Sequence, residues 1–338
     1  MKEPKKISIK QLMDALLDTD TPLHPRYLYR LSDLSQADIK ALQNTWPKVP
    51  AWRRQNIMED IEDLGTSDYV LSFEAFARYG LKDEEARVRE LAVRALWEYE
   101  ERDLIPIYLK LLVDDPDPGV RAVTATALGK YIFLGEIEEL AESTLHKIED
   151  GLLKVTQGGD STIVRRRALE SLGFSSREEV PPLIEAAYHS GNNEWLISAL
   201  FAMGQSANKE WNPSVISKLH SDQTDVLFEA VRAAGELEIK ETVPRLMQLL
   251  EEEDADVRLA AVWSLSQIGG EGVRERLEEL FEETDDDEEA DYIEDALDNL
   301  DFTEDVQIFD LLDLSEEEED DDYDEFEEFE DEEEDQKD

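Results

Sequence analysis

The sequence predicts an all-α fold in which pairs of helices stack into an α-solenoid. This prediction depends on a short apolar pattern that recurs along the chain and on the regular spacing of its copies. The clearest copy covers residues 254–269. It starts with Asp254 and Asp256, at a position where a helix N-terminus favours carboxylates. Apolar or small residues then recur three and four positions apart, which indicates one apolar helix face, and Gly269 is placed to end the helix.

The copies can be aligned by the first core residue of each pattern, which we call the anchor. The anchors are Val88, Val120, Val164, Trp195, Val226 and Val257. They are separated by 32, 44, 31, 31 and 31 residues. A second apolar stretch with helical spacing lies between successive anchors and is commonly opened by proline, which the first turn of a helix tolerates. One helix pair cannot bury both of its apolar faces alone, so stacked pairs must supply a continuous core.

The chain divides into four expected parts. Residues 1–80 contain helical stretches without a regular repeat, and we expect an irregular helical N-terminal cap. Residues 81–304 form the solenoid. Its longest interval, after Val120, predicts a lengthened helix within Tyr131–Val155 and a following loop; growth of this kind is tolerated in surface loops, although insertions in solenoids can also serve binding. Residues 305–314 are apolar between acidic stretches, and we expect them to dock on the last repeat or to act as a linker; a partner-binding motif is the alternative.

Residues 315–338 form an acidic, low-complexity tail. Such a composition cannot bury enough apolar surface to order itself, so we expect the tail to be disordered. Three aromatic residues recur at every third position: Tyr323, Phe326 and Phe329. Aromatic residues in acidic segments can anchor in a basic, apolar groove, which makes these three the candidate partner-binding residues. A tail that only increases solubility is the alternative.

The phrase Asp117-Pro-Gly-Val-Arg-Ala-Val-Thr-Ala-Thr-Ala-Leu-Gly129 resembles HEAT repeats, and most of all the short variety of phycobilisome-lyase-like proteins. The resemblance covers about residues 50–300 and implies an armadillo-like α-solenoid. It also implies that the arginine after the anchor pairs with an aspartate at the turn of the same or a neighbouring repeat. We call these arginines the arginine ladder: Arg89, Arg121, Arg165 and Arg258. Leu196 and Leu227 hold this position in the fourth and fifth copies, so the ladder should be interrupted there.

The net charge is −51 at pH 7 and is concentrated toward the C-terminus. Residues 283–338 hold 33 Asp and Glu against one Lys, whereas the residues before them hold 52 Asp and Glu against 33 Lys and Arg. Binding to nucleic acid or to anionic lipid relies on Lys and Arg, so this charge opposes both ligands and favours a basic protein partner. The chain has no cysteine, no secretory signal pattern and no apolar run near the ~20 residues of a membrane span. We expect a soluble, cytoplasmic monomer.

The sequence predicts no catalytic, cofactor or metal site. Hydroxylases of this repeat fold bind iron through His-Glu pairs, and none of the four histidines here is followed by glutamate. The leading hypothesis is therefore a non-catalytic scaffold that mediates protein–protein interaction along the repeats. The alternative is an acidic chaperone or nucleic-acid mimic that binds basic proteins through its tail. The resemblance adds a lesser alternative, a bilin-lyase-like protein, but no residue can be named for that chemistry.

Overall fold

The computed structural model describes residues 7–67 and 70–320, with side chains as far as residue 303. Within these residues the chain forms eighteen α-helices and no strand, so the predicted all-α fold is confirmed. The helices fall into two compact units, Met1–Ala207 and Asn208–Asp338, which we call unit 1 and unit 2. Each unit is described separately.

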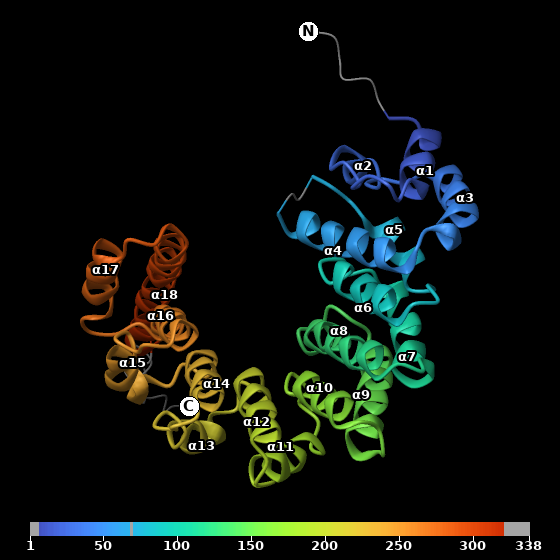
Figure 1. Cartoon of the computed structure of the whole chain (residues 1–338). Helices are drawn as coiled ribbons and strands as arrows, with labels where there is room; N and C mark the ends of the chain where they lie inside the picture. The colour runs from blue at the N-terminus through green and yellow to red at the C-terminus, as the bar shows by residue number, and fades with distance from the viewer. Residues whose placement is uncertain (1–6, 68–69, 321–338) are drawn as a thin grey trace, which may run out of the picture. The chain divides into compact units, whose positions relative to one another are not determined.

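Unit 1 contains helices α1 to α12 (Figure 1). Their bounds are α1 Ile9–Leu17, α2 Arg26–Tyr29, α3 Gln36–Thr45, α4 Ala51–Ser67, α5 Glu74–Gly80, α6 Ala86–Ala95, α7 Ile105–Asp114, α8 Pro118–Glu136, α9 Glu142–Gln157, α10 Thr162–Leu172, α11 Val180–Tyr188 and α12 Asn193–Gln205. Helices α4, α6, α8, α10 and α12 pack side by side in chain order, and we call this row the even-numbered layer. Helices α7, α9 and α11 pack against it as the partners of the repeat pairs.

The anchors of unit 1 lie in the even-numbered layer, and in α8 and α12 a polar side chain three positions before the anchor caps the helix. Asp117 accepts hydrogen bonds from the backbone N–H groups of Gly119 and Val120, at 2.8 and 3.2 Å. Asn192 accepts one from the N–H of Trp195, at 3.2 Å. A capping side chain satisfies N–H groups that have no partner inside the helix. In α8 and α12 this residue therefore helps to set where the helix begins, whereas Glu85 and Ser161 at the same position of α6 and α10 make no side-chain capping bond.

Small residues let neighbouring helices of a layer approach closely. A Cβ atom on Gly173, at the end of α10, would lie only 2.7 Å from Cα of Ala202 on α12. In unit 2, a Cβ on Gly235 would lie 2.8 Å from Cα of Ser264. The glycine that closes the repeated phrase is thus a contact point between successive repeats, in addition to any role at a helix end.

The long interval after Val120 differs from the expectation. We expected one lengthened helix within Tyr131–Val155, but this stretch contains the end of α8, a turn and most of α9. Helix α8 has 19 residues and α9 has 16, so the additional residues lengthen both helices of the pair. In the turn between them Glu138 has a positive φ of 64°. The additional residues of this interval therefore lie mainly in helices, where packing stabilises them, and less in a surface loop.

Unit 2 repeats the same arrangement with six helices, α13 Asn212–Ile216, α14 Thr224–Glu236, α15 Val243–Leu249, α16 Ala255–Ile268, α17 Val273–Glu283 and α18 Asp287–Asp320. Helices α14, α16 and α18 pack side by side, and α13, α15 and α17 pack on them. Gly269 ends α16 with a φ of 65°, as its position predicted.

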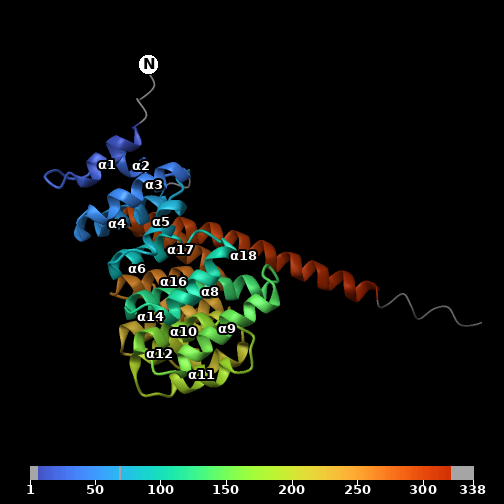
Figure 2. The same cartoon turned by 90° about the vertical axis from the view of Figure 1, so that its right-hand side faces the viewer.

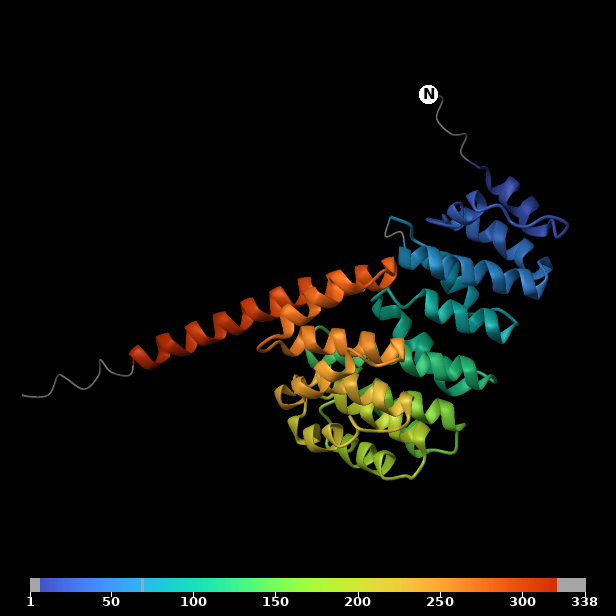
Figure 3. The same cartoon turned by 60° about the vertical axis from the view of Figure 1, so that its left-hand side comes forward.

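The last helix, α18, is one continuous helix (Figures 2 and 3). Its backbone includes the segment 305–314 and the first six residues of the expected tail, 315–320. The remaining tail, with the candidate residues Tyr323, Phe326 and Phe329, lies outside the described residues.

Candidate partner-binding surface

The first predicted ladder residue, Arg89, lies on α6 and is buried in an ion pair. Its guanidinium donates two hydrogen bonds of 2.7 Å to Asp115, and the two side chains are only 10% and 4% exposed. It also donates to the backbone oxygens of Asp83 and Glu84, at 2.9 and 3.1 Å. Burial acts to raise the pKa of Asp115, but the hydrogen bonds from Arg89 and from the backbone outweigh it and lower that pKa. The pair joins the turn before α6 to the turn before α8.

Arg121 on α8 and Arg258 on α16 have the same geometry. Arg121 donates to both carboxylate oxygens of Asp160, at 2.9 and 2.7 Å, and this hydrogen bonding lowers the pKa of Asp160. Arg258 donates to both oxygens of Glu289, at 2.9 and 3.4 Å, so its acceptor is a glutamate where the resemblance implied an aspartate. Like Arg89, each of these arginines also donates to the backbone oxygen six residues before itself.

The fourth predicted ladder residue, Arg165 on α10, behaves differently. It donates to the backbone oxygen of Thr156, at 2.9 Å, and its guanidinium lies 5.4 Å from the centre of the Trp195 ring. Among the residues that the structure describes it makes no ion pair. Trp195 is the anchor of the next repeat. Arg165 therefore lies against an aromatic ring, whereas the other ladder arginines bind a carboxylate.

The sequence left Arg54 among arginines that belong either to the ladder or to a solvated face, and its contacts match those of the ladder. Arg54 on α4 pairs with Asp83 at 3.3 Å, and these side chains are 3% and 2% exposed. Asp83 also accepts a 2.6 Å hydrogen bond from the indole N–H of Trp46. Arg54 lies 35 residues before Arg89, close to the repeat period. The ladder arginines are buried or half-buried and bonded within the chain, so a partner must bind to other, exposed side chains.

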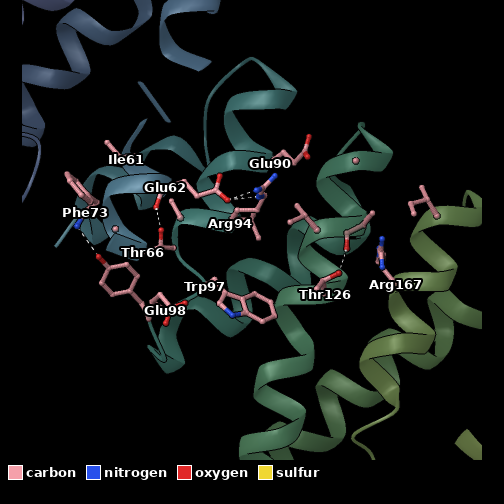
Figure 4. Close-up of a pocket in the computed structure, with 18 residues that line it drawn as sticks. Ile61, Glu62, Thr66, Phe73, Glu90, Arg94, Trp97, Glu98, Thr126 and Arg167 are labelled. Atoms are coloured by element: carbon pink, nitrogen blue, oxygen red, sulfur yellow. Dashed lines mark hydrogen bonds and ion pairs between the residues drawn. The ribbon is translucent and has the colours of Figure 1, made fainter. Parts of the chain in front are cut away.

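A groove of about 560 Å³ lies on the face of the even-numbered layer in unit 1 (Figure 4). Helices α4, α6, α8 and α10 and the turn after α6 contribute its walls. The sequence could not tell which helix of each pair lines such a face; the structure assigns it to the helix that carries the anchor. Two large apolar side chains of the groove are exposed, Trp97 at 41% and Ile163 at 37%, and Val123 is half-buried beside them in the lining.

The turn that carries Trp97 is held by hydrogen bonds to two other segments. Nζ of Lys130, on α8, donates to the backbone oxygen of Trp97 at 3.0 Å. The phenol oxygen of Tyr99 accepts a 2.9 Å hydrogen bond from the backbone N–H of Phe73 (Figure 4). The exposed indole therefore lies on a fixed turn, which lowers the entropic cost of ordering this segment when a partner binds.

The charges that line the groove are nearly all satisfied within the chain. Four of the five ionised lining residues form ion pairs: Arg94 with Glu62 at 2.6 Å, Arg167 with Glu170 at 2.5 Å, and Glu90 with Arg87 at 2.8 Å. The fifth, Glu98, is exposed and forms no ion pair with the residues that the structure describes. The net effect is a mainly apolar groove with one unmatched carboxylate.

Across residues 7–67 and 70–320 no helix has the length and apolar character of a membrane span. The same described part of the chain holds no group of three or more His, Asp or Glu side chains arranged as metal ligands.

Comparisons with known proteins agree with the repeat pattern. The sequence model of the HEAT-repeat family matches residues 75–150 and 212–298. No curated protein matches the chain. Among solved structures, the chain is similar to YibA of Escherichia coli, with 16% identity over 73% of this chain and 96% of that one, at a TM-score of 0.40. It is also similar to the CpcE–CpcF complex of phycocyanin lyase from Nostoc sp. PCC7120, with 20% identity over 67% and 94% of the chains and a TM-score of 0.45.

A third similar structure is importin beta, with 12% identity over 86% of this chain and 41% of that one, at a TM-score of 0.40. The family match falls on the repeats themselves, and its two stretches contain the anchors Val88, Val120, Val226 and Val257. The resemblance to HEAT repeats seen in the sequence is confirmed for these two stretches.

Proposed function

We propose that the protein is a non-catalytic scaffold that binds a protein partner in the groove of unit 1. The observation that supports this is the exposure of Trp97 and Ile163 in one fixed groove. Large apolar side chains in contact with water are stabilised when a partner covers them, and tryptophan is enriched among residues that dominate binding energy. A volume of about 560 Å³ lies within the usual range of ligand pockets.

A second candidate function is that of an acidic chaperone that shields basic proteins through its C-terminal tail. Its support is the charge of residues 315–338, which hold 18 Asp and Glu against one Lys. Binding of this kind depends on long-range attraction and should be lost in ~1 M salt, where charges are screened beyond about 3 Å. Binding by packed apolar side chains should persist, because exclusion of apolar surface from water does not depend on such screening.

The two candidates can be separated by quantitative capture from a lysate of the source organism. Four forms are compared: the full chain, a chain that ends at Asp320, Ile163→Asp in the groove, and Val113→Asp as a matched control. Val113 is 63% exposed on α7 and does not line the groove. If the groove binds the partner, all forms except Ile163→Asp should capture the same protein. This capture should persist in high salt. A partner lost with the tail and retained by Ile163→Asp would refute the groove and support the acidic chaperone.

A further inference from the structure

We infer that the groove takes a basic segment of the partner, in which a large apolar side chain lies close to a lysine or arginine. This inference rests on the proposed function and adds the chemistry of the occupant. It depends on two features of the groove, an apolar strip and one unmatched carboxylate.

The apolar strip crosses three successive elements of unit 1. Trp97 follows α6, Val123 lies on α8 and Ile163 lies on α10. Packed helices lie about 8–10 Å apart, so a strip across three of them is ~20 Å long. An extended peptide rises about 3.3 Å per residue and spans this length with about six residues. The strip therefore fits a short linear segment, and the groove has room for one of its large side chains.

The charge of the groove selects the sign of that segment. The two arginines of the lining, Arg94 and Arg167, already pair with carboxylates of the chain, so an acidic segment would find no unpaired cation there. It would also meet the carboxylate of Glu98, which lacks an ion pair among the described residues. A lysine or arginine would supply the missing counter-charge. Indole rings attract cations as well, so Trp97 favours the same class of segment. These charges disfavour the acidic residues 315–338 of the chain itself as the occupant.

The inference can be tested by selecting from a phage-displayed library of random dodecapeptides on the full chain. We expect the enriched peptides to place Lys or Arg within about three residues of a Leu, Ile, Phe or Trp. The enriched consensus is then synthesised with a fluorescent label, and its affinity is measured by anisotropy. Glu98→Lys should weaken binding about 10-fold, because it replaces an attraction by a repulsion, and Glu98→Gln about 3-fold. Glu178→Lys, at an exposed glutamate outside the groove, should leave the affinity within about twofold.

Three results would overturn the inference. The first is that the library enriches acidic or purely apolar peptides. The second is that the consensus peptide binds the wild type and Glu98→Lys equally well. The third is that the full chain enriches no peptide over a bare support. None of these three outcomes refutes the scaffold function if Ile163→Asp still abolishes capture of the partner in the lysate experiment. Conversely, capture that is unaffected by Ile163→Asp refutes the scaffold function at this groove whatever the library yields. Circular dichroism of each variant verifies that it is folded.

Discussion

Replacing Arg89 by methionine tests whether the arginine ladder holds successive repeats together. Methionine keeps much of the buried aliphatic volume but removes the two 2.7 Å hydrogen bonds to Asp115 and the two bonds to backbone oxygens. Asp115 is then left as a buried carboxylate whose counter-ion is gone. Removing one partner of a buried ion pair costs about 3–5 kcal/mol. Because Asp115 keeps a 2.9 Å hydrogen bond from the N–H of Asp117, we expect the lower end, ~3 kcal/mol.

The same helix supplies a matched control. Arg87 also forms ion pairs, with Glu59 and Glu90, but its side chain is 41% exposed and its partners are in contact with solvent. Exposed pairs of this kind contribute about 0–1 kcal/mol, so Arg87→Met should change the free energy of unfolding little. The assay is urea unfolding of the wild type and of both variants, followed by far-ultraviolet circular dichroism. Equal losses of stability in the two variants would refute the structural role assigned to the ladder.

The pH dependence provides a second readout of the same perturbation. The folded-state pKa of Asp115 lies below its ordinary value of 3.8. The stability that the pair contributes is therefore complete above pH 3.8 and is lost as the pH falls through the lower folded-state pKa. We expect the difference in unfolding free energy between the wild type and Arg89→Met to be constant near pH 7 and to shrink below about pH 4. A difference that grows on acidification would contradict this assignment.

Three further predictions concern packing, capping and titration. Gly173→Ala should lower the free energy of unfolding by about 1–3 kcal/mol, because its Cβ would press on the backbone of Ala202. Gly159→Ala, with open space around the new Cβ, should change it by no more than ~0.5 kcal/mol in the same urea assay. Asp254→Ala removes the cap of α16 and should cost about 1 kcal/mol; an unchanged unfolding midpoint would show that the cap is dispensable. Burial raises the pKa of Tyr131 to about 12, so its stabilising contribution is complete below pH 10 and is lost as the pH rises through 12. Ultraviolet difference absorbance should show a phenol titrating near pH 12 that disappears in Tyr131→Phe; a Tyr131 that titrates near pH 10 would contradict the burial described here.

The repeat architecture could be predicted because each helix carries its own local signals. The capping residue, the anchor and the apolar stripe recur at fixed offsets, and these offsets directly encode a helix face. The acceptors of the ladder were harder to predict. Arg121 finds its acceptor at Asp160 only after the long helices α8 and α9, and Arg165 meets the ring of Trp195 in place of a carboxylate. Which group lies opposite an arginine depends on the length of the intervening segments, and the repeat pattern does not encode that length.

The groove could not be predicted from the sequence. Trp97 lies nine residues after the anchor Val88, at the position that glycine takes in later copies of the phrase, and Glu98 follows it. The repeat pattern marks this position but does not indicate that its side chain is exposed. The exposure of Trp97 and Glu98 depends on which helix of each pair lines the groove. Packing between successive repeats decides this, whereas the apolar stripe of a single helix indicates only which of its own faces is buried. Residues with a strong sequence signal, such as the ladder arginines, are in contrast buried or half-buried and bonded within the chain.

The most direct test of the central claim, that the groove of unit 1 binds the partner, is hydrogen–deuterium exchange of the full chain with and without its captured partner or selected peptide. Binding in the groove should slow amide exchange in the segments 86–99, 118–126 and 162–167, which carry its walls. The same segments of Ile163→Asp should show no change at the same ligand concentration. Protection confined to α7, α9 and α11, or to residues 321–338, would contradict the account.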